Sequence, residues 1–501
     1  MQGIRGPPYR FFIGNVKDLV QLMLNASSQP MPDFSHNIVP RVFSFYHHWK
    51  KTYGATFLIW FGPTARIVVS DPNLIREIFT KSESYEKIEA HPLVKQLEGG
   101  GLISLKGEKW AHHRKIITPT FHMENLKLLI PMVGRSVTEM LDKWAAKSAG
   151  GEVEVEVSGW YEALTEDVMT RMAFGSSYEE GKAIFRLHSR QMALAADAFQ
   201  KVLIPLYRFV PSRRNLKFWK LDGEIKGSLV KLIERRKESW RSEMEAAAAA
   251  EEPKDLLGLL VQAGIGDGGS RTGEFNPFPS GKITVDDIVE ECKSFFFAGK
   301  QTTSNLLTWT TVLLAMHPQW QVLARDEVLR VCGSRDVPTK DGIAKLKTLS
   351  MILNESLRLY PPAIATIRHA KSDVELGGYR VPRGTELLVP IVAVHHDPAV
   401  WGNDADEFNP MRFADGVARA AKHPVAFIPF GLGIRTCIGQ NLAILHAKLV
   451  LAIVLRRFSF RLAPSYQHAP TVLMLLYPQH GAPIIFQHVS DLVAPTKDQR
   501  S

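Results

Sequence analysis

A short glycine-rich loop holds one cysteine directly before a helix, and this feature constrains the rest of the chain most strongly. The loop runs from Phe430 to Gly439 and reads Phe-Gly-Leu-Gly-Ile-Arg-Thr-Cys-Ile-Gly, with the thiol at Cys437. The pattern that follows predicts a helix over residues 439–457. A helix N-terminus supplies backbone N–H groups and the positive end of the helix dipole, which favour a thiolate. The loop therefore predicts a thiolate that can bind a metal.

Two interpretations of Cys437 are open at this point. An ordinary buried cysteine packs as a small hydrophobic residue. The alternative is a thiolate ligand of haem iron, and the whole loop favours it. Gly431, Gly433 and Gly439 let the backbone pass close under a flat macrocycle. Arg435 can direct its guanidinium at a haem propionate.

The loop resembles the cysteine loop of the cytochrome P450 superfamily, Phe-x-x-Gly-x-Arg-x-Cys-x-Gly, at Phe430, Gly433, Arg435, Cys437 and Gly439. The resemblance implies a mainly α fold, in which a large helical bundle is joined by a smaller N-terminal β-rich region. Haem b is then expected between a long distal helix and the cysteine loop, with iron bound by Cys437. We expect one haem-thiolate monooxygenase domain over residues 1–501, monomeric, that uses dioxygen and NADPH through a reductase.

The distal helix is predicted to start at Thr284, with Asp287 three residues later as a capping box, and to end near His317. Within it, Ala298 and Gly299 remove bulk from the helix surface, and Thr302 offers a hydroxyl group at the same place. Small residues in a helix are also typical of close helix packing, which is the alternative. The family resemblance implies that this segment crosses the distal face of haem, where the threonine helps to deliver protons.

Gln301 departs from the family pattern, because many members have an acidic residue directly before the threonine. An amide cannot exchange a proton as a carboxylate can. We therefore expect proton delivery to depend on Thr302, ordered water and the substrate's own hydroxyl groups, with Gln301 as a further catalytic candidate.

Three charged residues predict a structural network. Glu355 and Arg358 lie at i and i+3 of a predicted helix, and Arg412 follows downstream. An isolated pair of this kind on a helix surface stabilises it by only a few tenths of a kcal/mol. The family resemblance implies instead a buried Glu-Arg-Arg network behind the cysteine loop.

Haem propionate contacts are expected, by resemblance, from Trp110, Arg114, Arg368 and Arg435. The histidines near them, at positions 112, 113 and 369, are interpreted as surface or supporting groups, since a histidine near a motif is more often satisfied locally than ligating. No His, Asp or Glu spacing suggests a separate metal site.

Family position also predicts the substrate pocket. The candidate segments are mostly apolar, which suits a large lipophilic molecule, although an ordinary core has the same composition. The segments are 88–105, 195–206, 295–298, 363–366 and 472–475. The residues expected to line the pocket are Phe297, Ala298, Ala363, Ile364, Ala365 and Leu473.

Composition indicates whether disulfides are expected and which classes of binding partner suit the chain. The only cysteines are Cys292, Cys332 and Cys437, so no disulfide framework is indicated. The net charge of +10 is compatible with nucleic acid, an anionic membrane or an acidic protein. Motifs for nucleic-acid binding are missing from the sequence. The resemblance implies that an acidic reductase docks on a basic face on the proximal side of haem, which is the side of the cysteine loop. The residues expected to form this face are Lys109, Lys115, Lys127, Arg435, Lys448, Arg456 and Arg457. Ordinary solvated charge is the alternative.

The N-terminal part shows no apolar run long enough for a transmembrane helix. Gly3-Ile-Arg-Gly-Pro-Pro8 resembles the proline-rich hinge that follows a membrane anchor in eukaryotic members. We therefore expect an anchor missing from this chain and a catalytic domain on the cytosolic face of the endoplasmic reticulum membrane; a naturally soluble protein is the alternative.

Along the chain, strands are predicted first and helices afterwards. A hairpin is expected over 56–60 and 66–70, followed by a helix that Asp71 caps and that ends near Thr80. Long helices are expected from 124 to 241, and a flexible region over about 242–282.

The substrate prediction depends on resemblance alone. The segments 3–15, 105–115, 121–131 and 298–303 resemble the plant brassinosteroid-inactivating branch, whose members oxidise the terminal carbon of the steroid side chain. Hydroxylation of a cytokinin side chain or of another plant hormone or lipophile is the alternative substrate class. A haem-binding sensor without turnover is the alternative of a different class, and Thr302 favours an enzyme over it.

Overall fold

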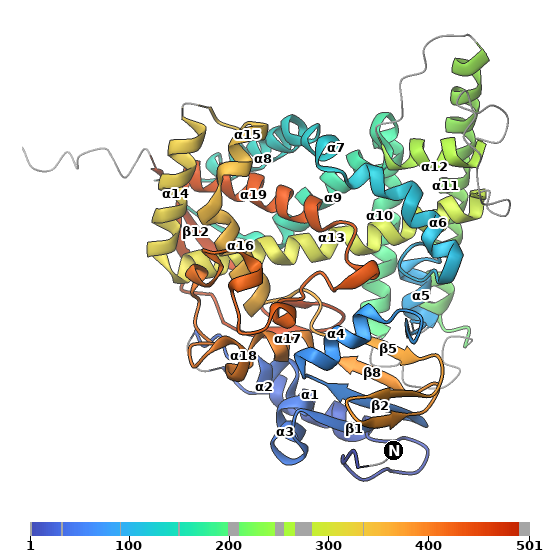
Figure 1. The fold of residues 1–501 in the computed structure, drawn as a ribbon. Coiled ribbons are helices and arrows are strands. Elements are labelled where there is room, and N and C mark those ends of the chain that lie inside the picture. Colours follow the sequence, from blue (N-terminus) through green and yellow to red (C-terminus); the bar gives the residue numbers. More distant parts are fainter. Residues whose placement is uncertain are drawn as a thin grey trace, which may run out of the picture.

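The computed structural model describes residues 3–31, 34–90, 92–148, 151–198, 210–245, 255–265, 283–333 and 335–489. Helices form most of the molecule, and the largest sheet lies at the end where the chain begins (Figure 1). None of the described helices is long and apolar enough to cross a bilayer.

The largest sheet combines strands from both halves of the chain in the order β1-β2-β8-β5-β3. The predicted hairpin is confirmed: β1 (Thr56–Phe61) pairs antiparallel with β2 (Thr64–Val69). Three further strands complete the sheet: β3 (Tyr85–Lys87), β5 (Thr366–Ala370) and β8 (Glu386–Val389). The β-rich region is therefore not only N-terminal, because β5 and β8 come from the C-terminal half.

The N-terminal segment also contains helices that were not predicted: α1 (Val16–Ser28), α2 (Val39–Val42) and α3 (Ser44–Tyr53) precede the first strand. The next helix, α4 (Pro72–Thr80), begins as expected. The Asp71 carboxylate accepts hydrogen bonds from the backbone N–H groups of Asn73 and Leu74, which caps the helix.

The long helix α13 (Val285–Met316) runs through the middle of the molecule (Figure 1). Its start is confirmed as a capping box between Thr284 and Asp287, and His317 is its C-cap. One side of α13 packs along α9 (Val157–Phe174), and the helix also contacts α16 (Lys347–Leu359) and α19 (Gln440–Arg457). Most of its apolar side chains are buried, so α13 is a core helix.

Other helices surround α13. Those used below are α5 (Pro92–Glu98), α6 (Gly107–Ile117), α7 (Met123–Lys127), α8 (Ile130–Ala145), α10 (Tyr178–Ala198), α11 (Arg213–Glu245) and α17 (Ile391–His395). The expected helical region 124–241 is interrupted by β4 (Glu152–Glu156), which pairs with β12 (Pro483–His488). Alternating glutamate and valine in β4 places its valines inward, a period of two that helical reasoning missed.

The predicted flexible region 242–282 is wrong in part. Helix α11 continues to Glu245, and α12 (Leu256–Ile265) is a helix. Leu256, Leu257 and Leu260 are buried in the main core, which explains why this apolar stretch is ordered. Residues 246–254 and 266–282 lie outside the described residues.

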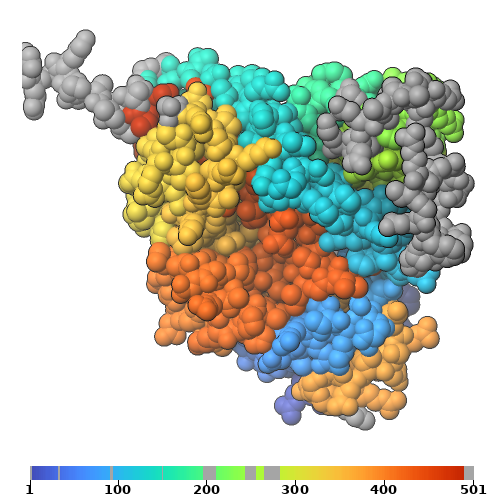
Figure 2. Space-filling model, turned by 45° about the horizontal axis from the view of Figure 1, so that its top comes forward, coloured from blue at the N-terminus to red at the C-terminus, as the bar shows by residue number. Residues whose placement is uncertain are grey.

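The segment that leads into the cysteine loop reaches the molecular surface. Figure 2 shows residues of about 400–430 (orange) between the blue segment that includes α4 and the cyan segment that includes α6 to α8. The loop therefore meets elements from the first third of the chain.

Candidate active site

The cysteine loop is held by its own backbone and by one close approach. The Cys437 N–H donates to the Phe430 carbonyl at 2.8 Å, which closes the loop. Gly433 has φ of +72°, and a Cβ there would lie 2.6 Å from the carbonyl oxygen of Phe79. Any other residue would clash with α4, so this glycine is required by the fold. Gly431 also has a positive φ, of +74°.

The thiol of Cys437 lies at the start of α19, whose N-cap is Gly439. Solvent reaches the side chain, yet surrounding protein still raises the pKa of the Cys437 thiol by desolvation. The N–H groups of Gly439 and Gln440 and the Arg114 guanidinium act in the opposite direction on that pKa. An accessible sulfur with donors and a cation aimed at it fits a metal-bound thiolate.

The other two cysteines do not fit this role. Cys292 on α13 and Cys332 at the end of a helix are both buried. Burial raises the pKa of each thiol and so disfavours the thiolate. Cys437 is the cysteine whose setting suits haem iron.

The middle of α13 presents a small surface toward the cysteine loop. Ala298 is exposed although its neighbours Phe296 and Lys300 are buried. Phe295 lies one helical turn before Ala298, and its ring is 6.2 Å from that of Phe121. Phe121 also approaches the loop, because a Cβ on Gly439 would be 3.9 Å from its ring. The face of α13 that carries Ala298 therefore lies on the side of the cysteine loop.

Thr302 lies one turn after Ala298 on this face, and its hydroxyl donates to the Ala298 carbonyl at 2.6 Å. The oxygen lone pairs of Thr302 stay available to accept a hydrogen bond from water or substrate. The structure thus places the hydroxyl next to the small residue, as the sequence predicted.

Gly299 packs against a neighbouring helix, and its role in opening the distal side stays a prediction. A Cβ at Gly299 would lie 2.5 Å from Met169 Sδ on α9. Gly299 therefore permits α9 to pack closely, whereas the neighbouring Ala298 is exposed. Close helix packing, which was the alternative interpretation, therefore applies to Gly299 and not to Ala298.

Gln301 is half-buried between Lys300 and Thr302. Sequence reasoning missed Lys300, which is buried and ion-paired with Glu162 at 2.9 Å and Glu166 at 2.8 Å, both on α9. These pairs fix the helix directly before the catalytic candidates. A lysine inside an apolar helical pattern was the available signal, since buried lysines need partners.

Three of the predicted propionate ligands come together as a group of cations. Electrostatic contacts link Arg114, Arg368 and Arg435, and the Arg435 guanidinium lies 4.1 Å from the ring centre of Trp110. Burial and the neighbouring Arg435 lower the pKa of Arg368 to about 10. Sequence reasoning missed a fourth member. Lys87 on β3 lies directly opposite Arg368 on β5 in the antiparallel register. Only the strand register reveals it.

This cationic cluster, formed by Lys87, Arg114, Arg368 and Arg435, fits an acidic cofactor. Within the described ranges none of its members forms an ion pair with a carboxylate, and three donate to oxygens of uncharged groups instead: Lys87 to Ile103 O, Arg368 to Thr366 Oγ1 and Ile367 O, and Arg435 to Leu105 O. Partly buried cations without counter-ions are costly. Haem b carries two propionate groups, which would supply the missing negative charge beside the thiol.

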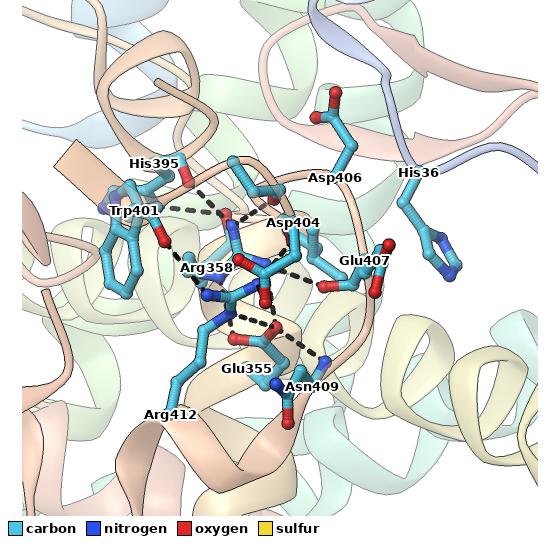
Figure 3. Close-up of polar contacts among 12 residues, drawn as sticks. His36, Glu355, Arg358, His395, Trp401, Asp404, Asp406, Glu407, Asn409 and Arg412 are labelled. Carbon is cyan, nitrogen blue, oxygen red and sulfur yellow. Dashed lines mark hydrogen bonds and ion pairs between the residues drawn. The ribbon is translucent and has the colours of Figure 1, made fainter. Parts of the chain in front are cut away.

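Figure 3 shows the contacts of the predicted charge network, in which Glu355 and Arg358 are buried and Arg412 is half-buried. The Arg358 guanidinium binds Glu355 in a bidentate pair, at 2.7 Å for both bonds, and neither side chain is exposed. Arg412 lies 3.5 Å from the Glu355 carboxylate and pairs with Asp404 at 2.6 Å. We call Glu355, Arg358 and Arg412 the charge network. Asp404 is a further charged residue that contacts this network and that the sequence did not indicate.

One of the three histidines near the motifs is a buried supporting group. His113 is buried, and its Nδ1 lies 2.7 Å from Glu291 on α13. The Glu291 carboxylate also accepts the N–H of Leu102. His113 therefore anchors α6 to α13, in agreement with the supporting role that was one of its two interpretations. His112 and His369 are half-buried.

The predicted pocket residues lie in half-buried positions. Ala363, Ile364, Ala365 and Leu473 are all partly exposed, and their segments meet where the Leu476 N–H donates to Pro362 O at 2.9 Å. Phe297 packs instead with a small apolar cluster that contains Leu97, Met192, Ala195 and Phe218. Of the predicted segment 195–206, residues 199–206 lie outside the described residues.

Most of the cations expected to form a basic docking face already have partners. Ion pairs join Lys109 to Asp287, Lys127 to Glu124, Arg456 to Asp336 and Arg457 to Asp142. Lys448 and Arg435 are half-buried, whereas Lys115 is exposed. The free positive charge on this side is therefore smaller than the sequence suggested.

Comparison with known proteins identifies the family. The family model for cytochrome P450 matches residues 33–485. Cytochrome P450 734A1 of Arabidopsis thaliana is 71% identical over 491 residues, which cover 98% of this chain and 91% of the relative. Cytochrome P450 734A6 of Oryza sativa is 60% identical, covering 97% and 90%, and secologanin synthase 2 of Catharanthus roseus is 43% identical over the same shares. The chain therefore belongs to the cytochrome P450 family, in the 734A branch, as a haem-thiolate monooxygenase.

Proposed function

We propose that the protein hydroxylates the terminal side-chain carbon of brassinosteroids and thereby inactivates the hormone. The observation that carries the proposal is the 71% identity to cytochrome P450 734A1 along nearly the whole chain. The four segments that resemble the brassinosteroid-inactivating branch support it. The half-buried apolar residues at 363–365 and 473 suit a rigid lipophilic substrate.

We assign the cofactor contacts on the basis of the geometry. Cys437 would hold the iron and the cationic cluster would hold the propionates, with Trp110 packed against Arg435. Phe430, Gly431 and Gly439 shape the loop that presents the thiol, and Ala298 would leave room for the cofactor on α13. Bound haem supplies the oxygen activation and C–H hydroxylation, with the thiolate favouring O–O cleavage.

The distal residues manage water and protons around that chemistry. The Thr302 hydroxyl donates to Ala298 O and accepts a hydrogen bond from water or from a substrate hydroxyl. Gln301 beside it can hydrogen-bond but cannot exchange a proton as a carboxylate does. Thr302 Oγ1 therefore orients the water or substrate hydroxyl that it accepts from, and this partner supplies protons to the site.

Family membership provides a lipophilic substrate and a reductase as partners. We propose that the reductase docks on the cysteine-loop side, where Lys115 is exposed on α6. Turnover would fall with rising salt if surface charge steers this docking. Salt-independent turnover would remove steering from the proposal.

We also propose the cytosolic face of the endoplasmic reticulum membrane as the location. Phe11 is 87% exposed and Phe12 is 75% exposed near the N-terminus, which suits contact with an apolar phase. Fractionation of plant cells that express the natural gene tests this, and recovery with soluble proteins would contradict it.

The substrate is tested by difference spectroscopy and turnover. Brassinosteroids should shift the haem spectrum by displacing water from iron, and a cytokinin panel run in parallel is the comparison. Reductase and NADPH should then yield a product with added oxygen on the terminal carbon, identified by mass spectrometry, which also reports whether aldehyde and acid follow. A response to cytokinins alone would overturn the substrate proposal. Ligand binding without NADPH consumption would indicate a sensor.

A further inference from the structure

His395 lies between the charge network and the cysteine loop. It is the last residue of α17, has no exposed surface, and stacks on Phe427 with ring centres 5.5 Å apart. Its Nδ1 lies 3.2 Å from the Arg358 carbonyl, and the Ile428 N–H donates to its Nε2 at 3.1 Å. One ring thus contacts the end of α16 and the segment that enters the loop.

The two partners fix the protonation state of this ring. A backbone N–H can only donate and a carbonyl can only accept, so Nε2 of His395 must carry the lone pair and Nδ1 the proton. Burial, followed by the nearby His396 and Arg358, lowers the pKa of His395 to about 3. The ring is therefore neutral at physiological pH, in one tautomer.

Arg358 and His395 hold each other reciprocally. The Arg358 guanidinium donates to the His395 carbonyl at 2.8 Å, while the His395 ring binds the Arg358 carbonyl (Figure 3). The same guanidinium is fixed by both oxygens of Glu355. The orientation of the ring is therefore set by a fully buried, charge-assisted group.

The loop continues this connection toward the sulfur. The Gly431 N–H donates to Ile428 O at 3.1 Å, and the Cys437 N–H donates to Phe430 O at 2.8 Å. Consecutive hydrogen bonds thus lead from Ile428 to Cys437. A shift at Ile428 would be passed to the backbone that presents the thiolate.

We propose that His395 is a positioning residue for the thiolate of Cys437, through its hydrogen bond from Ile428. The family signature motifs that the sequence analysis used do not include this residue. The competing explanation is aromatic packing on Phe427, and the two make different predictions for substitutions. The inference does not depend on the identity of the substrate.

Three variants separate the two explanations. His395→Gln keeps an oxygen that can accept from Ile428 but removes the ring. His395→Phe keeps an aromatic ring of similar volume and removes both hydrogen bonds. Phe427→Leu removes the stack and leaves both bonds. Each is purified as haem-loaded protein, with haem content and circular dichroism as checks of folding.

The primary measurement is the Soret band of the reduced carbon monoxide complex, which is strongly red-shifted only with thiolate ligation. We expect His395→Phe to lose the red-shifted form several-fold more than His395→Gln does, and to raise the reduction potential of the iron. Phe427→Leu should keep the red-shifted band. A wild-type spectrum and potential in His395→Phe would overturn the proposal, as would equal losses in the two His395 variants.

If His395→Phe does not retain haem, the Phe427→Leu variant distinguishes positioning by hydrogen bonds from aromatic packing. Retention of its red-shifted band with a lowered melting temperature supports positioning by hydrogen bonds. Loss of the band in Phe427→Leu would show that packing holds the loop and would overturn the proposal.

Discussion

Lys87 lies directly opposite Arg368 in the antiparallel pairing of β3 with β5. Burial is the largest cause that lowers the pKa of both side chains. The Glu98 carboxylate raises the pKa of Lys87, whereas like-charge repulsion from Arg368 lowers it. Repulsion from Arg435 lowers the pKa of Arg368 further. In the described part of the chain neither has a carboxylate ion-pair partner. The sheet therefore assembles positive charge that a bound anion would help to balance, beside an accessible thiol.

Removal of Lys87 tests its role in haem binding. Lys87→Met should speed haem loss, because a charge-assisted hydrogen bond contributes roughly 1.5–3 kcal/mol; Arg368→Met should have a similar or larger effect. Transfer of haem to an excess of apomyoglobin measures the rate. Lys51→Met, at an exposed position on α3, is the matched control. An unchanged rate in Lys87→Met would exclude the residue from the cluster's function.

Loss of Glu355 should prevent stable folding around haem. Glu355→Ala leaves the Arg358 guanidinium buried without its carboxylate, which costs roughly 3–5 kcal/mol. Haem content and urea unfolding measure the effect. Glu77→Ala breaks an exposed pair with Lys81 at 2.9 Å and should change the free energy of unfolding by less than about 1 kcal/mol. Full haem retention in Glu355→Ala would contradict the assigned role.

The hydroxyl of Thr302 should govern how efficiently NADPH is used. Thr302→Ala removes the oxygen that accepts from water or substrate, so we expect several-fold more peroxide for each NADPH consumed. Thr302→Ser keeps the hydroxyl and serves as the control. Gln301→Glu introduces a group that exchanges protons and should reduce peroxide leakage. If peroxide yield and coupling in all three variants equal those of the wild type, Thr302 does not orient the group that delivers protons.

Gly299 and Ala298 should respond differently to added bulk. Gly299→Ala forces a Cβ to 2.5 Å from Met169 Sδ, so the protein should lose roughly 1–3 kcal/mol of stability, partly restored by Met169→Ala. Ala298→Val adds bulk at an exposed position and should weaken substrate binding with little change in the melting temperature. Thermal unfolding and binding titrations distinguish the two. Equal stability losses would mean that both residues only pack.

Local patterns in the sequence predicted the parts of the site that lie on one element. The cysteine loop, the capping box at Thr284, the hairpin over 56–69 and the turn between Glu355 and Arg358 each follow from spacing and residue type within a few positions. These features depend on backbone geometry that short-range chemistry sets.

Relationships between distant elements were not readable from one sequence. Lys87 joins the cationic cluster only because β3 pairs with β5, and Gly299 faces Met169 only because α9 crosses α13 at that turn. His113 and Lys300 are buried because carboxylates from other helices meet them. Strand register and helix crossing decide such contacts, and neither leaves a local signature.

Buried neutral histidines should make the protein sensitive to acid. Burial, as the largest cause, lowers the pKa of His36 and His395 to about 3 and of His188, His446 and His468 to about 4, from an ordinary value of 6.5. The unfolded chain therefore binds more protons than the folded protein between about pH 6.5 and pH 3. The free energy of unfolding should therefore fall as the pH drops through this window.

His36 provides the test, because it links several elements. Its Nδ1 lies 2.8 Å from Tyr360 Oη and its Nε2 lies 3.1 Å from His317 Nε2. Protonation of the ring would remove the acceptor that one of these contacts requires. Urea unfolding at pH 7.5, 6.5 and 5.5 should show a smaller loss of stability with acid in His36→Gln than in the wild type, although the variant is less stable at pH 7.5. His480→Gln, at an exposed histidine, is the control and should leave the pH dependence unchanged. A wild-type pH dependence in His36→Gln would show that this histidine does not contribute to the acid sensitivity.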